Sequence, residues 1–293
     1  MARNIRRNAR GFSLCALRGR FGRAAASYAL CPMHLQVISS GSQGNCTLIR
    51  AGERRVLVDA GLPGVELEER LEVAGVPPPN AERPALRHVW VTHGHLDHAR
   101  SAGFIARKHR ARLHCAESLM GNAAIRRCRD LHTLPVGGAQ ELDDLVVRNV
   151  AIPHDAHPTV AYRIEHAGRV AAILTDMGRP DDGVARALAG AHVLVLEFNH
   201  DLGMLQSGPY PPALKKRVAG DGGHLSNDQS AQMLRKLASE ALHTLVLAHL
   251  SEKNNRPDIA LDVAHKTLAE LGLDRRVRVL VADQHAIGEN LAV

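Results

Sequence analysis

The chain has 293 residues, 45% hydrophobic and 23% charged, which is enough for one large domain or two small ones with a real core. No apolar run reaches the roughly 18 residues that a membrane-spanning helix needs, so the composition predicts a soluble protein that no membrane holds. The net charge of +7 comes from residues 1–32, which carry seven Arg and no acid; the remainder is formally neutral, so the charge says nothing about a basic DNA-binding face on the folded domain.

The acid-free segment 1–32 allows three interpretations: an organellar transit peptide, a basic arm for nucleic acid, or sequence upstream of a true start at Met33. We favour a disordered or non-native extension, because a strong strand pattern begins directly after Met33. No linker or low-complexity tract interrupts residues 33–285, so we expect residues 33–293 to form a single domain.

Short strands joined by turns open this domain, and strands then alternate with helices. The expected strands are 34–38, 47–49, 55–59, 88–92, 113–115, 145–150, 160–164, 170–174, 192–197, 244–248 and 277–281. The expected helices are 66–74, 98–109, 117–127, 181–188, 227–237 and 258–271. A hairpin-rich start followed by repeated alternation predicts two mixed sheets packed together with helices outside.

The most informative segment follows the expected strand 88–92. It places three imidazoles and one carboxylate, from His93, His95, Asp97 and His98, within six residues. Imidazole and carboxylate are ligands that a borderline metal such as Zn²⁺ prefers. His93 and His95 can direct nitrogens at one metal, while Asp97 and His98 face a second. A chance cluster is an alternative in a chain with 18 His, but an Asp at this position after a strand favours a two-metal site.

Four further strand patterns end in a residue that can bind a metal, namely Asp59, His154, Asp176 and His249. Taken alone, an Asp before a turn is common, and a His after a strand is more often a surface or core residue. Together with the segment 93–98, however, these residues fit one pattern. Binding residues at the ends of rigid strands, from distant parts of a chain, are how a sheet scaffold builds a site.

The order of these residues resembles the five-motif layout of metallo-β-lactamase-fold hydrolases. A narrower resemblance, to the YycJ/WalJ-like branch of 5′→3′ DNA exonucleases, extends from Met33 to the last expected strand. The segments that carry it are 39–45, 154–156, 197–201, 204–205, 210–211, 223–227, 247–251 and 254–255. The resemblance implies an α+β fold, a four-layer αββα sandwich of two mixed β-sheets flanked by helices, with a two-metal site along one edge.

The resemblance also implies a role for each metal-competent residue. One metal would be held by His93, His95 and His154, the other by Asp97, His98 and His249, and Asp176 would bridge the two. Asp59 would orient a ligand imidazole through its other N–H, and Glu197 is expected to lie behind the site as well. Two divalent cations are therefore expected, with Zn²⁺ favoured and Mn²⁺ or Fe²⁺ allowed by the same ligands.

Such a site predicts phosphodiester hydrolysis. Two cations lower the pKa of a bridging water toward 7 and polarise a phosphoryl oxygen, and Asp97 or Asp176 would hold the attacking hydroxide. His224 resembles a histidine that phosphodiesterases of this superfamily place near the scissile phosphate. We expect it to stabilise charge or to protonate the leaving oxygen; the alternative is a histidine that only opens a helix.

Polar residues around these motifs are expected to contact the substrate. They are Ser40, Ser42, Asn45, Asn199, His200, Ser226 and Asn227. The polar segment 197–201 is expected to support His224, the alternative being that it only ends a strand. Ser226 or Asn227 is also the expected cap of the helix 227–237.

Nucleic acid is the expected partner, with DNA favoured over RNA. Lys215–Arg217 and the group Arg107, Lys108, Arg110 and Arg112 can follow a phosphate backbone, although charge runs are more often solvated faces. Only 3% of the residues are aromatic, which leaves few platforms for stacking bases. A neutral body also predicts modest non-specific affinity.

Three readings of function stay open. The first is a DNA exonuclease that acts in DNA repair or maintenance. The second is an RNA-processing or small-phosphodiester hydrolase of the same fold, although an RNA 3′-processing enzyme would carry a long Gly/Pro-rich arm that we do not find. The third is a non-catalytic metal-binding regulatory protein, against which the complete ligand set argues.

The cysteines indicate a reducing compartment. They number five, at Cys15, Cys31, Cys46, Cys115 and Cys128, and none forms a C-x-x-C pair. An odd count without pairs argues against a disulfide framework and against a thiolate zinc site. We therefore expect reduced thiols and a cytoplasmic protein.

Overall fold

The computed structural model describes residues 31–79, 86–142 and 144–293, so the extension predicted over 1–32 lies outside the described residues except for Cys31 and Pro32. Two seven-stranded sheets form the framework. Across the first sheet the order is β14 (Leu291–Ala292), β1 (Met33–Ser39), β2 (Cys46–Ala51), β3 (Arg54–Val58), β4 (His88–Trp90), β5 (Arg112–Cys115) and β6 (Leu131–Thr133). Across the second it is β13 (Arg278–Val281), β12 (Thr244–Ala248), β11 (Val193–Glu197), β10 (Arg169–Leu174), β9 (Thr159–His166), β8 (Leu145–Ile152) and β7 (Ala139–Leu142).

Each sheet is antiparallel in one half and parallel in the other. In the first sheet β14, β1, β2 and β3 pair antiparallel, and β3 to β6 pair parallel. In the second sheet β7 to β10 pair antiparallel, and β10 to β13 pair parallel. The predicted hairpins and the predicted pair of mixed sheets are therefore confirmed.

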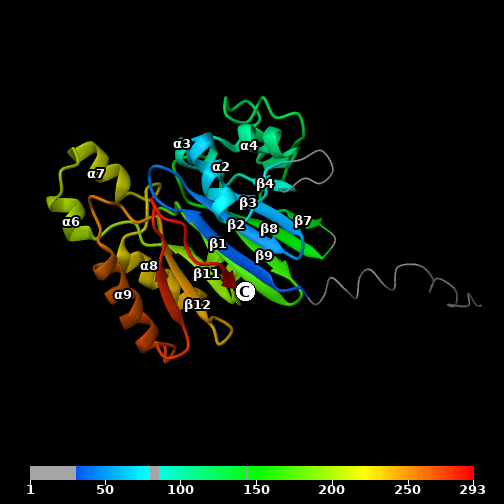
Figure 1. Cartoon of the computed structure of the whole chain (residues 1–293). Coiled ribbons are helices and arrows are strands. Elements are labelled where there is room, and N and C mark those ends of the chain that lie inside the picture. Colours follow the sequence, from blue (N-terminus) through cyan, green and yellow to red (C-terminus); the bar gives the residue numbers. More distant parts are fainter. Residues whose placement is uncertain (1–30, 80–85, 143) are drawn as a thin grey trace, which may run out of the picture.

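Helices cover the outer faces of both sheets (Figure 1). The helices α2 (Gly64–Val73), α3 (Leu96–Ala99) and α4 (Ala102–His109) lie on the first sheet, and α5 (Asp182–Leu188), α8 (Asn227–Leu237) and α9 (Pro257–Glu270) on the second; α6 (Leu202–Ser207) and α7 (Pro212–Val218) lie together at one end. The four-layer αββα sandwich is confirmed. Among the described residues no helix combines the length and apolar character needed to cross a membrane.

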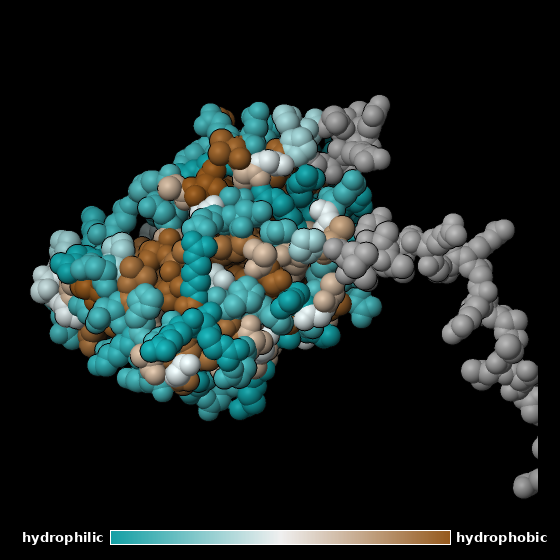
Figure 2. Space-filling view, turned by 60° about the horizontal axis from the view of Figure 1, so that its bottom comes forward, coloured by the Kyte–Doolittle hydropathy of each residue, from teal (hydrophilic) through white to brown (hydrophobic). Residues whose placement is uncertain are grey.

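Three apolar clusters separate these layers. Alternate residues of one strand belong to different clusters: Val193 and Val195 of β11 pack between the sheets, and Leu194 and Leu196 pack against the outer helices. Such two-sided burial explains why the inner strands are continuously apolar in sequence. At the surface, apolar residues remain visible in the middle of one face, between hydrophilic residues (Figure 2).

The helix expected over 98–109 is interrupted between α3 and α4. The backbone N–H of Ser101 donates to Ala60 O at 2.9 Å, and Ser101 Oγ donates to Leu62 O at 2.6 Å. These hydrogen bonds hold Ser101 against the turn after β3, and its backbone N–H is therefore not used for a hydrogen bond within the helix. The interruption fixes α3, which carries Asp97 and His98, against that turn.

The helix expected over 117–127 is wrong. Only a short 3₁₀ turn, Glu117–Leu119, forms, and turns follow. Asn122 Oδ1 accepts from Ala124 N at 2.9 Å, and Asn122 Nδ2 donates to Gly94 O at 3.2 Å. A side chain that bonds nearby backbone in this way competes with helix formation.

Two buried histidines make the folding stability depend on pH. His88 Nδ1 lies 2.9 Å from His114 Nε2, and His88 stacks on Trp90. Burial, helped by neighbouring positive charges, lowers the pKa of His88 to about 4 and that of His114 to about 3, from 6.5. Below pH 6.5 the unfolded chain therefore binds protons that the folded chain does not. Acidification from pH 7 to 5 should lower the free energy of unfolding by up to about 1.4 kcal/mol per pH unit for each histidine.

Urea unfolding of the metal-free protein at both pH values measures this loss. A His88→Gln, His114→Gln double variant should lose less stability on acidification than the parent. An equal loss in both proteins would contradict the assignment.

Candidate metal centre

The candidate ligands meet because strands of both sheets end at one edge. Asp59 follows β3 and the segment 93–98 follows β4, and these two strands are parallel. Asp176 and His249 follow β10 and β12, which run parallel on either side of β11. Carboxyl ends of parallel strands lie side by side, so loops far apart in sequence share this edge.

Three of the strand-end residues adopt a left-handed backbone. Their φ angles are 63° at Asp59, 59° at Asp176 and 56° at His249. Residues other than glycine rarely adopt this conformation, although Asp and His tolerate it better than most. Strain of this kind persists where the surroundings fix it, typically at functional sites.

The turn after β3 packs backbone to backbone against the loop that follows β4. Ala60 N donates to His98 O at 2.8 Å, and Asn45 N donates to Asp97 O at 2.7 Å. A Cβ on Gly61 would lie only 1.7 Å from Asp97 O, so no other residue fits there without moving the loop. Gly61 therefore sets the position of Asp97 and His98.

Of the four sets of side chains that can each hold a cation, three consist only of predicted ligands. Within each set the ligand atoms lie within 4.8 Å of one another. The sets are His93, His95 and His154; Asp97, His98 and His249; and His93, His98 and Asp176. The third set shares one residue with each of the other two, so the structure brings all seven residues together in one cluster.

Four of the five imidazoles of this cluster are held at their Nδ1 atoms. His98 Nδ1 lies 2.7 Å from Asp59 Oδ2, and His154 Nδ1 donates to Gly223 O at 3.0 Å. His93 Nδ1 lies 3.1 Å from Thr92 Oγ1, and His249 Nδ1 lies 3.3 Å from Glu197 Oε1. Such partners fix the ring and its tautomer, so that Nε2 faces the other candidate ligands; His98 Nε2, for example, lies 2.7 Å from Asp176 Oδ2.

One buried nitrogen supports metal binding directly. Within the described part of the chain, His93 Nε2 is buried and has no hydrogen-bond partner. A buried polar atom without a partner calls for an explanation such as an ion. The donor set, imidazole and carboxylate, suits Zn²⁺, so these residues fit the group that the sequence implies.

His224 lies beside the same cluster. Its Nδ1 is 2.8 Å from Glu197 Oε1 and 3.2 Å from Asp176 Oδ1. Burial disfavours the charged ring, but the Glu197 and Asp176 carboxylates outweigh it and raise the pKa of His224 to about 9. Glu197 is itself fixed, because its Oε2 accepts from Met177 N at 2.8 Å.

The sequence analysis did not identify Asp155 as a residue of the site, and it did not predict that Arg217 binds Asp155. Asp155 Oδ1 lies 3.4 Å from His154 Nε2 and 3.5 Å from His95 Nε2, next to the atoms that would face a metal. Arg217 Nε donates to Asp155 Oδ2 at 2.6 Å, so α7 closes this side of the cluster. The position of Asp155 directly after His154 was the available signal.

The residues expected to contact substrate divide into two groups. Ser40, Asn45 and Asn199 lie at the cluster: Ser40 Oγ accepts from His249 N at 2.8 Å, Asn45 Nδ2 lies 2.9 Å from His98 Nε2, and Asn199 Nδ2 donates to His249 O at 2.9 Å. Ser42 is exposed on the same turn as Asn45.

The other three residues, His200, Ser226 and Asn227, are buried and bonded to other parts of the protein. His200 is 1% exposed and forms a β-bridge with Ser226. Ser226 caps α8 in a capping box with Gln229, and Asn227 exchanges two hydrogen bonds, of 3.0 and 2.9 Å, with Asn255. His200, Ser226 and Asn227 therefore have hydrogen-bond partners within the fold, and their contact with a substrate stays a prediction.

Comparison with known proteins gives one consistent result. Residues 54–250 match the family model of the beta-lactamase superfamily domain. Exodeoxyribonuclease YycJ of Bacillus anthracis is 31% identical over 245 residues, which cover 82% of this chain and 90% of YycJ. Exodeoxyribonuclease WalJ of Streptococcus pneumoniae is 30% identical over 253 residues, which cover 84% of this chain and 92% of WalJ.

A solved structure extends the likeness to the fold. The metallo-beta-lactamase fold protein YhfI from Bacillus subtilis superposes with a TM-score of 0.65 and covers 87% of this chain and 98% of its own. Its sequence is only 15% identical, so this likeness concerns the fold alone.

Proposed function

This chain belongs to the β-lactamase superfamily, in the branch of YycJ and WalJ, and on that premise we propose that it is a metal-dependent exonuclease that degrades DNA with 5′→3′ polarity in DNA repair or maintenance. The observation that carries the proposal is the set of imidazoles whose Nδ1 atoms are held by Thr92, Asp59, Gly223 and Glu197, two of which, His93 and His249, have a buried Nε2 without a hydrogen-bond partner. The relatives named exodeoxyribonuclease, similar over most of the chain, supply the substrate class.

The proposal assigns a task to each residue of the cluster. His93, His95 and His154 would hold one divalent cation, Asp97, His98 and His249 a second, and Asp176 both. Zn²⁺ suits these donors best, with Mn²⁺ or Fe²⁺ as alternatives. Asp59 would orient His98, since its carboxylate contacts the Nδ1 atom of that ring.

A pair of divalent cations supplies a nucleophile at neutral pH and polarises the phosphoryl oxygen. The protein residues then position the reaction. Asp97 or Asp176 would hold the attacking hydroxide, and His224 would face the phosphate as a cation or proton donor. Glu197 holds His224 through the contact of 2.8 Å, and its carboxylate favours the charged form of the ring.

We also propose that residues 33–293 form one domain in the cytoplasm. Strands of both sheets contribute to the apolar cluster between them, which argues for one domain. The four cysteines among the described residues, Cys31, Cys46, Cys115 and Cys128, are free thiols, as expected in a reducing compartment.

A substrate panel tests the activity. The full chain, loaded with Zn²⁺ or Mn²⁺, is offered single- and double-stranded DNA labelled at either end, RNA of the same sequence, and bis-p-nitrophenyl phosphate. Stepwise release from the 5′ end of DNA is expected. Cleavage of RNA in preference to DNA would indicate the RNA-processing alternative, cleavage of the small diester alone a small-phosphodiester hydrolase, and metal binding without any turnover a regulatory protein.

Asp59→Asn should weaken metal binding by about 10- to 100-fold, because it removes the carboxylate that fixes His98 while preserving the shape of the side chain. Titration against a chelator of known affinity measures the effect. The exposed Asp262 on α9 provides the matched control, since Asp262→Asn should leave the affinity unchanged. An Asp59 variant with parental affinity would rule out this role.

A further inference from the structure

A strongly basic surface lies on the outer side of the first sheet. Residues 100–130 contain eight Lys or Arg and two acids, a net charge of +6. Residues 33–293 as a whole contain 30 of each sign, so the rest of this body is correspondingly acidic. The eight basic side chains are all exposed: Arg100, Arg107, Lys108, Arg110, Arg112, Arg126, Arg127 and Arg129. Lys108 pairs with Glu68 of α2 at 3.0 Å and Arg112 lies 3.7 Å from Asp130, so the positive charge of this segment is concentrated on the other six side chains.

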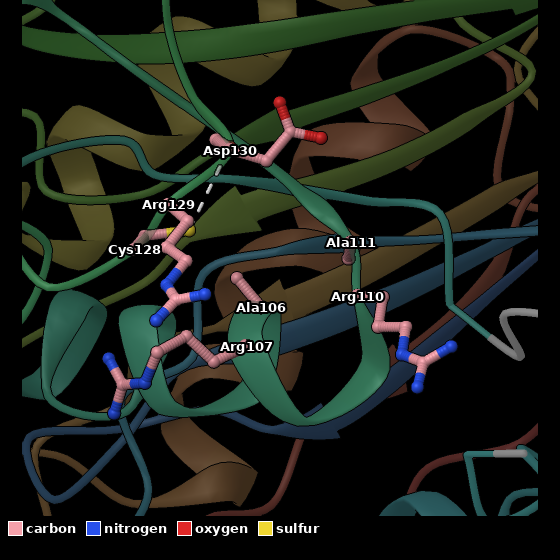
Figure 3. Close-up of a pocket in the computed structure, with 7 residues that line it drawn as sticks. All are labelled: Ala106, Arg107, Arg110, Ala111, Cys128, Arg129 and Asp130. Atoms are coloured by element: carbon pink, nitrogen blue, oxygen red, sulfur yellow. Dashed lines mark hydrogen bonds between the residues drawn. The ribbon is translucent and has the colours of Figure 1, made fainter. Parts of the chain in front are cut away.

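This surface contains a pocket of about 480 Å³ between α4 and residues 128–130. Arg107, Arg110 and Arg129 line it, and the small residues Ala106 and Ala111 leave the space open (Figure 3). The side chains of Arg107 and Arg129 extend toward one side of the pocket, whereas the carboxylate of Asp130 turns the other way (Figure 3). Asp130 is already engaged, with its Oδ1 2.5 Å from His132 Nε2.

The three pocket arginines lack the carboxylate partners that several other exposed arginines have. Arg235, Arg256 and Arg278 each pair with a carboxylate at 2.7 to 2.8 Å. Within residues 31–79, 86–142 and 144–293, no ion pair is formed by the pocket arginines. The guanidinium groups of Arg107 and Arg129 lie on one side of the hollow and that of Arg110 on the other (Figure 3), so successive anions along its rim would each find a positive partner. The planar guanidinium matches a phosphate with two parallel hydrogen bonds.

The basic surface is connected to the metal centre. Asn122 Nδ2 donates to Gly94 O in the ligand loop, and Gly103 N at the start of α4 donates to Ala124 O at 3.1 Å. The helix α4 begins four residues after His98 and spans eight residues, or about 12 Å. A duplex advances about 3.4 Å per nucleotide of each strand, so this length corresponds to three or four nucleotides.

We propose that this surface, with Arg107, Arg110 and Arg129 at its centre, binds backbone phosphates of duplex DNA a few nucleotides from the end held at the metal centre. The inference rests on the proposed function, because it takes DNA as the substrate. It assigns the arginines to holding the substrate and gives them no part in bond cleavage. The chain then favours long substrates over short ones.

The test is a triple variant, Arg107→Gln, Arg110→Gln and Arg129→Gln, with Arg235→Gln, Arg256→Gln and Arg278→Gln as a control of equal charge. Binding of a fluorescent duplex of about 20 base pairs is measured in EDTA, so that no cleavage is needed, over a series of salt concentrations. Loss of three phosphate contacts should raise Kd by about tenfold or more and reduce the slope of log K against log salt by about 2.7. The control should keep the parental slope.

Hydrolysis separates this surface from the metal centre. The triple variant should cleave bis-p-nitrophenyl phosphate like the parent and lose only the preference for long over short DNA. Parental Kd and slope in the triple variant would overturn the inference, as would an equal loss in the control. If the parent binds DNA through these arginines without cleaving it, the surface stands and the proposed nuclease activity fails.

Discussion

His95→Ala should lower DNA hydrolysis by about 10³-fold, because loss of one metal position removes several kcal/mol of transition-state stabilisation. His95 is the most suitable ligand to replace. Its side chain is 36% exposed, whereas that of His98 is fully buried, so Ala at position 95 opens no cavity in the core. Turnover of labelled DNA and metal content per chain should fall together.

The exposed His265 on α9 provides the control for this variant, and His265→Ala should retain parental metal content and turnover. Thermal unfolding of the metal-free proteins establishes that both variants fold. A folded His95→Ala protein with two metals and parental turnover would remove His95 from the site.

His224→Ala should lower DNA hydrolysis by about 10²- to 10⁴-fold, the usual contribution of a positioned acid or base. We place His224 outside the metal ligands, so metal content should stay unchanged in this variant. A loss of metal would instead make His224 a ligand, since its ring lies with Asp176, Glu197 and His249 in a fourth set that can hold a cation.

The leaving group distinguishes the two roles proposed for His224. p-Nitrophenolate leaves without a proton, whereas the alkoxide released from DNA needs one. If His224 protonates the leaving oxygen, the variant should lose much less activity on bis-p-nitrophenyl phosphate than on DNA. If it stabilises charge on the phosphate, both losses should be similar. Parental DNA turnover would eliminate both roles.

The cluster could be predicted from sequence because each member follows a recognisable strand. Apolar runs buried on both faces end abruptly at Asp59, Asp176 and His249, whereas His154 follows a strand that alternates between buried and exposed residues; each boundary is visible without coordinates. The order of strands and helices follows from the same periodicity, and it accounts for the layers.

Features set by tertiary contacts could not be read in this way. The helix expected over 117–127 has helical composition but fails because Asn122 bonds Gly94, 28 residues away. The short helices α6 and α7 and the strands β6, β7 and β14 were not predicted, since segments of two to seven residues carry little periodicity. The position of Asp155 directly after His154 hints at a role, but its distances to His95 and His154 are needed to place it at the cluster.

The left-handed backbone at Asp176 and His249 lowers the stability of the fold at two residues that the proposed activity needs. Glycine adopts this conformation without strain, whereas other residues there cost on the order of 1 kcal/mol or more. Asp176 also adds a buried negative charge beside Glu197 that only a cation or protonated imidazole compensates. Directed evolution for heat resistance alone, carried out without metal, should therefore select glycine at these two positions and erase the site. Any stabilisation campaign must include turnover in its screen.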